Sequence, residues 1–189
     1  MQRVGILGGT FNPIHIGHLI LGEEAVWKLK LDRVFYIPSY IPPHKDADIA
    51  SPEDRFSMVN LALEDNPHFE VSRVEIDNKG TSYSVNTLRE LKSYFGSEVS
   101  LFFIAGSDSL RELFSWKDID EIFRLSNFVV AERPGYPVEE IPKNIETVVI
   151  TPIEISSSEV RRRIKEGRSI RYLVPDKVRE YIHRKKLYI

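Results

Sequence analysis

The chain has 189 residues, a formal net charge of -2 at pH 7 and no cysteine. This length suits a single domain over residues 1–189, and the near-neutral charge argues against nucleic acid as a partner. The lack of cysteine excludes disulfides, thiolate zinc sites and a cysteine nucleophile. No apolar run reaches the roughly 18 residues that cross a bilayer, so we expect a cytoplasmic chain without a membrane partner.

Short β-rich runs alternate with amphipathic helical patterns along most of the chain. The expected strands are 3–7, 33–38, 69–76, 99–106, 127–132 and 147–151, and the expected helices between them are 16–30, 52–64, 83–95 and 118–126. Two further helices, 156–167 and 175–186, fall in a helical portion from about residue 154 to 189. This order predicts an α/β fold, a doubly wound Rossmann-like parallel sheet with a helical C-terminal tail. The long Pro-rich loop 38–52 is typical of a binding loop or lid.

Glycines follow the first expected strand, where an open α/β sheet binds its ligands. Gly8 and Gly9 carry no Cβ, so the backbone can approach a phosphate and present N–H groups to it near a helix start. Their spacing is neither a Walker A motif nor G-x-G-x-x-G, which disfavours kinase and dehydrogenase functions. Taken alone, the pair is equally typical of a tight turn between a strand and a helix.

Two histidines open the next helix in the sequence "HIGH". His15 and His18 are three residues apart and share a helix face, with Gly17 leaving room for a ligand between them. Two imidazoles can donate hydrogen bonds to phosphate oxygens and stabilise developing charge. A core or capping role is the alternative for either histidine alone, but the pair behind a glycine turn favours an anion site. Zinc is disfavoured because H-E-x-x-H spacing and a third ligand are missing.

A second polar stretch, "ISSSEVR", runs from Ile155 to Arg161. Ser156 and Glu159 fit a capping box, which organises a helix start whose N–H groups bind anions. Ser157 and Ser158 add hydroxyl donors, and Arg161 adds a guanidinium for phosphate oxygens. A third candidate is "AGSD", where Asp108 follows Gly106 at a strand end. Asp108 is interpreted either as an acceptor for ribose hydroxyls or as a simple helix N-cap.

Together, "GGTFNPIHIGH" and "ISSSEVR" resemble the nucleotidylyltransferase superfamily, which shares HxGH with class I aminoacyl-tRNA synthetases. The lysine loop of the synthetases is absent. Within the superfamily the chain is similar over nearly its whole length to bacterial nicotinate-mononucleotide adenylyltransferases, through "PPHK", "EDRFSMVNLAL", "GTSYSVNTL", "FIAGSDS", "FSWKDI" and "ERPG". It departs from them at Ser84 and Ser158, where the family often has threonine, and both positions keep a hydroxyl.

The resemblance implies transfer of AMP from ATP to the phosphate of nicotinate mononucleotide, which forms deamido-NAD and pyrophosphate in NAD biosynthesis. It implies catalytic roles for His15, His18 and Arg161. ATP would contact these three and Gly8, Gly9, Thr10, Phe11, Gly106, Asp108, Ile155, Ser157 and Ser158. The acceptor would contact Lys45, Arg55, Tyr83, Ser84, Trp116 and Arg133. Mg²⁺ would arrive on the ATP phosphates, with no protein metal site expected.

Within the acceptor set, Lys45 and Arg55 are expected to bring phosphates in from the Pro-rich loop. Trp116 resembles the family's tryptophan that stacks on the pyridine ring, with core packing as its alternative. Two other functions stay open. One is an adenylyltransferase that uses nicotinamide mononucleotide or pantetheine phosphate as acceptor. The other is a non-catalytic nucleotide-binding or RNA-associated module that uses the basic C-terminal tail; a homo-oligomer is compatible with the sequence.

Overall fold

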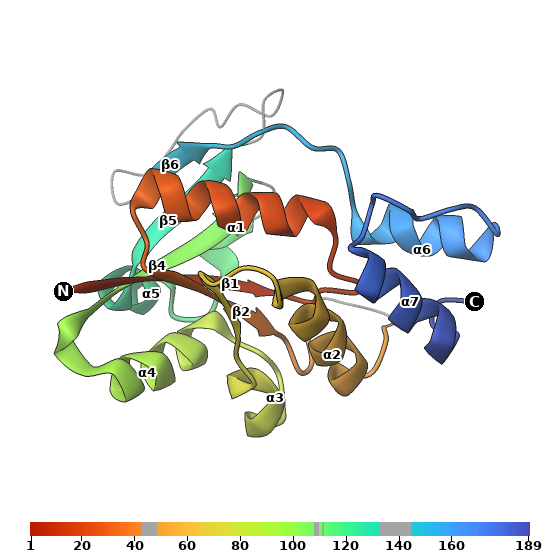
Figure 1. Cartoon of the computed structure of the whole chain (residues 1–189). Coiled ribbons are helices and arrows are strands. Elements are labelled where there is room, and N and C mark those ends of the chain that lie inside the picture. Colours follow the sequence, from red (N-terminus) through yellow and green to blue (C-terminus); the bar gives the residue numbers. More distant parts are fainter. Residues whose placement is uncertain (43–48, 108–109, 111, 133–144) are drawn as a thin grey trace.

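A computed structural model describes residues 1–42, 49–107, 110, 112–132 and 145–189 (Figure 1). In this part of the chain six strands form a sheet in the order β3-β2-β1-β4-β5-β6, and each neighbouring pair is parallel. The strands are β1 (Gln2–Gly9), β2 (Arg33–Pro38), β3 (Phe69–Val71), β4 (Val99–Gly106), β5 (Asn127–Glu132) and β6 (Ile145–Val149). The helices are α1 (Ile16–Leu29), α2 (Pro52–Leu63), α3 (Val74–Asn78), α4 (Ser84–Phe95), α5 (Ile119–Leu125), α6 (Ser157–Lys165) and α7 (Asp176–Lys185).

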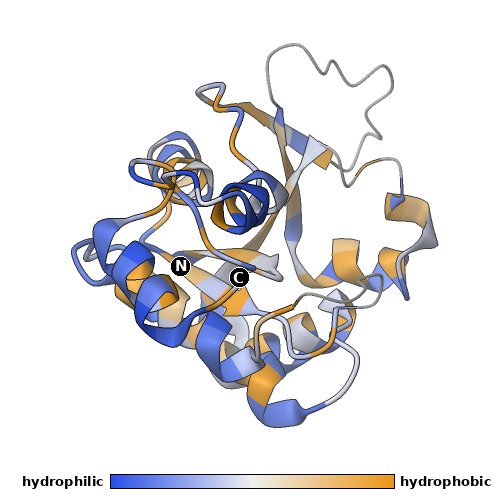
Figure 2. Cartoon of the chain, turned by 90° about the vertical axis from the view of Figure 1, so that its right-hand side faces the viewer, coloured by the Kyte–Doolittle hydropathy of each residue, from blue (hydrophilic) through white to orange (hydrophobic). Residues whose placement is uncertain are grey.

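The sheet has an apolar core on each face because alternate side chains of a strand point to opposite sides. In β4, Phe102 and Ile104 belong to the cluster that includes residues of α1 and α2, whereas Leu101 and Phe103 belong to the cluster of α4 and α5. Figure 2 shows helices that turn their hydrophilic residues outward around a largely hydrophobic interior. The doubly wound parallel sheet expected from the sequence is therefore confirmed.

The direction of winding reverses between β1 and β4. The chain runs outward from β1 through β2 to β3, and then returns to the other side of β1 with β4. Ligands of open α/β sheets bind at such a switch point, beyond the carboxyl ends of the strands. Figure 1 shows α6 and α7 at the end of the molecule toward which β1 runs, opposite the N-terminus.

One expected strand was too long. Of the run 69–76, Phe69–Val71 alone pairs with β2, and α3 begins at Val74. The backbone N–H of Ser72 donates to Tyr36 O and its hydroxyl accepts from the N–H of Val74, so the strand ladder gives way to a turn there. The alternation of residues 69–76 gave no local sign of this change, because tertiary contacts decide it. Among the described helices, none is both long and apolar enough to cross a membrane.

Candidate active site

The carboxyl end of β1 holds the two glycines at the switch point. A Cβ on Gly9 would lie 3.1 Å from the Phe11 ring, so glycine lets the buried Phe11 fold back against the strand end with φ of 49°. No atom lies within 4 Å of a Cβ built on Gly8, which leaves open space beside its backbone. The Thr10 carbonyl accepts a hydrogen bond of 2.8 Å from Nη1 of Arg55. The turn is thus fixed on one side and open on the other.

The two histidines stack at the start of α1. His15 is the N-cap residue and is buried, whereas His18 is half-buried, and their ring centroids lie 3.7 Å apart at an interplanar angle of 27°. The backbone N–H of His15 donates to Nδ1 of His18 at 3.1 Å. Because Nδ1 accepts, a neutral His18 carries its proton on Nε2. Nε2–H is therefore the ring donor that His18 can offer to an anion.

Neighbouring side chains hold this pair in place. A Cβ on Gly17 would lie 3.1 Å from Nδ1 of His15, so the glycine makes room for that ring, while its expected role in leaving room for a ligand stays a prediction. Tyr36 donates its hydroxyl to the carbonyl of His18 at 3.1 Å, and burial raises the pKa of Tyr36, which keeps the hydroxyl protonated. The rings of Phe11 and His18 form a T-shaped contact at a centroid distance of 5.1 Å. Packed imidazoles of this kind need little rearrangement to stabilise a developing charge.

The Ser-Arg stretch lies directly against the turn that precedes the histidines. Ser157 donates its hydroxyl to the Pro13 carbonyl at 2.9 Å, across 144 residues of sequence. Arg161 donates from Nη1 to the Asn12 carbonyl at 2.8 Å and from Nη2 to the Ser158 hydroxyl at 3.3 Å. In the described part of the chain Arg161 forms no ion pair, so its positive charge stays available for an anion. The two diagnostic stretches thus form one site.

The remaining expected ATP contacts lie at the same edge or outside the described residues. Gly106 ends β4 and pairs with Ala131 of β5. Ile155 packs against the core cluster that contains Phe11 and Ile14. Asp108, expected to contact ATP, lies outside the described residues, as do Lys45 and Arg133, which were expected to contact the acceptor. Within the described ranges, no three His, Asp or Glu side chains are grouped as a metal-binding set.

The expected acceptor residues Tyr83 and Trp116 come together from two elements. Tyr83 is the N-cap of α4, Ser84 is its first residue, and the Lys117 ammonium lies 4.6 Å from the Tyr83 ring centroid. Trp116 is half-buried, and its indole forms a T-shaped contact with Phe103 at a centroid distance of 5.9 Å. Both Tyr83 and Trp116 pack against the core cluster on the α4 side of the sheet. Core packing, the alternative for Trp116, therefore describes only part of this side chain, because Trp116 packs against the core but is half-buried.

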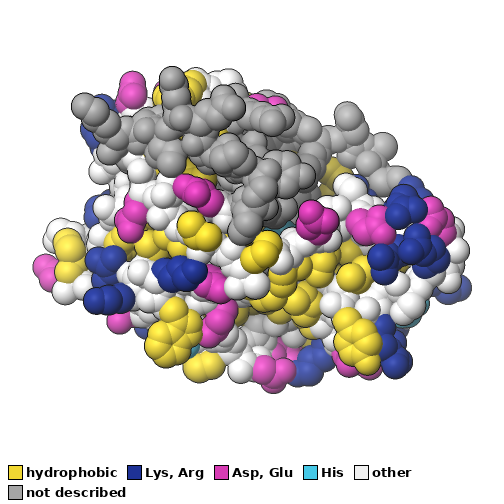
Figure 3. All heavy atoms as spheres, turned by 90° about the horizontal axis from the view of Figure 1, so that it is seen from above, with side chains coloured by type: hydrophobic (Ala, Val, Ile, Leu, Met, Phe, Trp, Pro, Cys, Tyr) yellow, Lys and Arg dark blue, Asp and Glu magenta, His cyan; other side chains and the backbone are white. Residues whose placement is uncertain are grey.

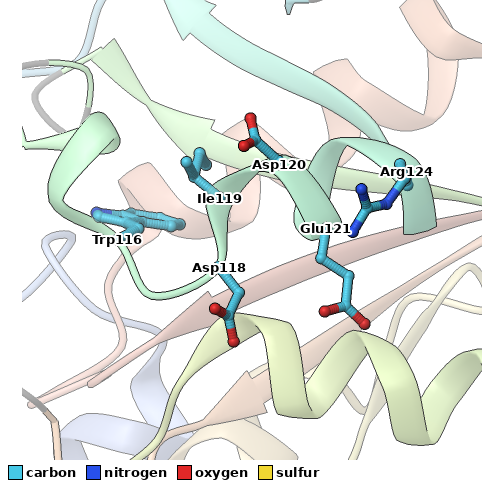
Figure 4. A pocket seen from close by; sticks show the side chains of 6 residues that line it. All are labelled: Trp116, Asp118, Ile119, Asp120, Glu121 and Arg124. Atoms are coloured by element: carbon cyan, nitrogen blue, oxygen red, sulfur yellow. The ribbon is translucent and has the colours of Figure 1, made fainter.

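Two hollows lie beside these residues. The larger, of about 350 Å³, is lined by Trp116, Asp118, Ile119, Asp120, Glu121 and Arg124 (Figure 4). Asp118 and Glu121 point toward α4, where both pair with Arg89. Three carboxylates against one arginine make this lining unsuitable for a phosphate. The second hollow, of about 270 Å³, borders Tyr83, Thr87 and Lys79, with the Glu75 carboxylate accepting from the Thr87 hydroxyl at 2.6 Å.

Arg55 is buried, although it was expected to bring a phosphate in from the Pro-rich loop. It lies in α2, within the expected helix 52–64, and 0% of its surface is exposed. Its guanidinium donates to the carbonyls of Thr10, Tyr40 and Ala50 at 2.8, 3.0 and 3.0 Å. Burial lowers the pKa of Arg55, with the charge on Glu75 partly offsetting this. Arg55 therefore ties the glycine turn to both ends of the loop, and its proposed contact with the acceptor stays a prediction.

Sequence reasoning missed two residues that organise this site. Asn12 is buried, and its Oδ1 accepts from the Ala50 N–H at 3.0 Å and from the Tyr188 hydroxyl at 2.7 Å. The position of Asn12 inside "GGTFNP" was an available sign of its importance. No local sign existed for Tyr188, because its partner lies 176 residues away.

A family model and several relatives match this chain. Residues 6–163 match the model described as cytidylyltransferase-like. The chain belongs to the cytidylyltransferase-like family. Of the curated relatives, one in Caldicellulosiruptor saccharolyticus is 46% identical over 198 residues and covers 99% of each chain. Another, in Thermus thermophilus, is 44% identical over 187 residues, with 99% of this chain and 100% of the relative covered. Both are named "probable nicotinate-nucleotide adenylyltransferase".

These identities place this cytidylyltransferase-like chain among the nicotinate-nucleotide adenylyltransferases, so the resemblance seen in the sequence is confirmed. Solved structures agree in fold. The Plasmodium falciparum nicotinic acid mononucleotide adenylyltransferase complexed with NaAD superposes with a TM-score of 0.83, at 18% identity, and covers 100% of this chain and 98% of its own. The same enzyme complexed with APC gives a TM-score of 0.80 at 17% identity, with the same coverage.

Proposed function

We propose that this protein transfers AMP from ATP to the phosphate of nicotinate mononucleotide, which yields deamido-NAD and pyrophosphate in NAD biosynthesis. The acceptor phosphate oxygen attacks the α-phosphorus of ATP, a new P–O–P bond forms, and the bond to the β-phosphate breaks. The observation that carries the proposal is the joining of the two stretches, through Arg161 to Asn12 and Ser157 to Pro13. Family membership supports the same reaction. We also propose that this reaction takes place in the cytoplasm.

The proposed chemistry depends on alignment and charge, since no side chain needs to form a covalent intermediate. His18 Nε2–H and the His15 ring would donate to the ATP phosphates and to the transition state, and Arg161 would hold the leaving pyrophosphate. Alignment of two bound reactants is worth roughly 7–11 kcal/mol of the barrier. Gly8, Gly9 and Gly106 would admit the nucleotide close to the backbone at the switch point. Mg²⁺ is proposed to enter on the ATP phosphates, where it would neutralise their charge.

The acceptor is proposed to lie between Trp116 and the start of α4. The accessible part of the Trp116 ring would stack on the pyridine ring. The carboxylate of nicotinate would face the first N–H groups of α4 near Tyr83 and Ser84, at the positive end of the helix. Lys117, held over the Tyr83 ring, adds positive charge nearby. A carboxamide is uncharged and presents its own donors to this region, so we expect the acid to be preferred by at least about 100-fold in kcat/KM.

A pyrophosphate-release assay tests the proposal. The protein is incubated with ATP, Mg²⁺ and, in separate reactions, nicotinate mononucleotide, nicotinamide mononucleotide or pantetheine phosphate. We expect release with the first, far slower release with the second, and none when EDTA is present. Equal efficiency with acid and amide would refute the carboxylate site, and release with pantetheine phosphate alone would identify a different adenylyltransferase. ATP binding without release from any acceptor would indicate a non-catalytic nucleotide-binding module.

A further inference from the structure

The last residues of the chain return to the turn that precedes the histidines. α7 ends at Lys185, and Lys186 and Tyr188 then adopt left-handed φ values of 53° and 65°. Such conformations cost free energy for residues with side chains, so other contacts must hold them. At Lys186 the contact is a local helix cap, in which the Leu187 N–H donates to Ile182 O at 3.1 Å. In Figure 2, which looks onto the end of the molecule that carries α6 and α7, the C-terminus lies near the centre of the view.

The tail reaches the candidate site through one hydroxyl. Tyr188 donates to Oδ1 of Asn12 at 2.7 Å, while its ring packs against the core cluster beside α7. Burial raises the pKa of Tyr188, so the hydroxyl stays a donor throughout the neutral range. The same Oδ1 accepts from the Ala50 N–H, and the Asn12 carbonyl accepts from Arg161. Tyr188 and Arg161, a proposed catalytic residue, thus both donate hydrogen bonds to Asn12.

Asn12 connects three segments that are far apart in sequence. It belongs to the turn between Thr10 and His15, it holds Ala50 at the base of the Pro-rich loop, and it receives the C-terminal tail. Ala50 is held on its other side as well, because its carbonyl accepts from Arg55. If the Tyr188 hydroxyl is removed, the Asn12 side chain loses one of the hydrogen bonds that fix its orientation. The Asn12 peptide, whose carbonyl Arg161 contacts, would then be held less firmly.

We propose that Tyr188 is a positioning residue for the nucleotide site, which acts through Asn12 on the turn before the histidines and on Arg161. This inference rests on the proposed function, since it assumes that this turn binds ATP. The proposed route through Asn12 requires no contact between Tyr188 and the substrate. The competing explanation is that its hydroxyl contributes to stability alone, as many buried hydroxyls do.

Tyr181 offers a matched control. Its hydroxyl donates to Oδ1 of Asp54 at 2.9 Å, so it joins α7 to α2 in the same region without contacting Asn12. Tyr181→Phe and Tyr188→Phe each remove one oxygen and keep the ring. If the hydroxyls act on stability alone, both variants should behave alike in every kinetic measurement made well below the melting temperature.

The experiment compares wild type, Y188F and Y181F in kcat, in KM for ATP and in ATP affinity measured by calorimetry without acceptor. We expect Y188F to lower kcat/KM for ATP by about 3- to 10-fold, the effect of one lost hydrogen bond. Y181F should stay within about twofold of wild type. In an Asn12→Ala background, Y188F should have almost no further effect, because the route through Asn12 is already lost.

Three outcomes overturn the inference: Y188F with wild-type kinetics and ATP affinity, equal losses in Y188F and Y181F, or an effect of Y188F that adds fully to Asn12→Ala. A wild-type protein that binds ATP but releases no pyrophosphate with nicotinate mononucleotide refutes the proposed function instead. The inference is then decided by ATP affinity, which should still be weaker in Y188F and unchanged in Y181F.

Discussion

The substitution Arg55→Met distinguishes two possible roles of Arg55, which could stabilise the fold or bind a phosphate. The side chain is fully buried, and three of its nitrogens donate to the carbonyls of Thr10, Tyr40 and Ala50. Methionine is also a long unbranched side chain, but it has no N–H donor for these carbonyls. A buried group that loses its partner costs about 1–3 kcal/mol.

The full sum over three carbonyls is an upper limit, because the variant also removes a desolvated charge. Burial lowers the pKa of Arg55, because removal from water disfavours its charged form. We therefore expect R55M to lower the free energy of unfolding by about 3–5 kcal/mol, in the lower part of the range of about 3–9 kcal/mol that three unsatisfied carbonyls would give. For a domain of this size that corresponds to a decrease in Tm of roughly 6–20 °C.

Urea denaturation followed by circular dichroism and tryptophan fluorescence measures this change. Arg162→Met is the control, because Arg162 is exposed and pairs with Glu159 and Glu166 on the surface of α6. It should leave the denaturation midpoint nearly unchanged. The reasoning is refuted if R55M unfolds at the wild-type midpoint but raises KM for ATP or for the acceptor more than about tenfold. That pattern would restore Arg55 as a phosphate ligand.

Three other predictions concern the site and its pH dependence. His18→Ala should lower kcat by about 100- to 1000-fold with little change in ATP affinity, and steady-state kinetics with near wild-type turnover would contradict its catalytic role. Trp116→Ala should raise KM for nicotinate mononucleotide, and an unchanged KM would contradict stacking. Burial raises the pKa of Glu75, so the native state binds this proton more tightly than the unfolded state. The stabilising contribution of the Glu75 proton is complete below the unfolded-state pKa of about 4.3 and is lost as pH rises through the raised native-state pKa. Glu75→Gln should abolish this dependence of stability on pH, measured as urea denaturation midpoints over the pH range between the two pKa values.

Much of the fold could be predicted because its signals are local. The expected helix at 175–186 differs from α7 by one residue at each end, and the one at 16–30 differs from α1 by one residue. Caps and apolar spacing act over a few residues, so a single sequence displays them. The short β3 and α3 were not separable in this way, since pairing with β2 and the hydrogen bonds of Ser72 decide where the strand ends.

The candidate site divides along the same line. The sequence alone determined its chemistry: glycines at a strand end, a histidine pair at a helix start, and a capped helix that carries Arg161. The tertiary structure decided which polar groups became partners. Arg161 meets Asn12 across 149 residues and Tyr188 meets it across 176, and folding buried Arg55 among three carbonyls. A guanidinium or hydroxyl donates to an acceptor that folding has buried beside it and removed from water. No local sequence pattern specifies which acceptor that is.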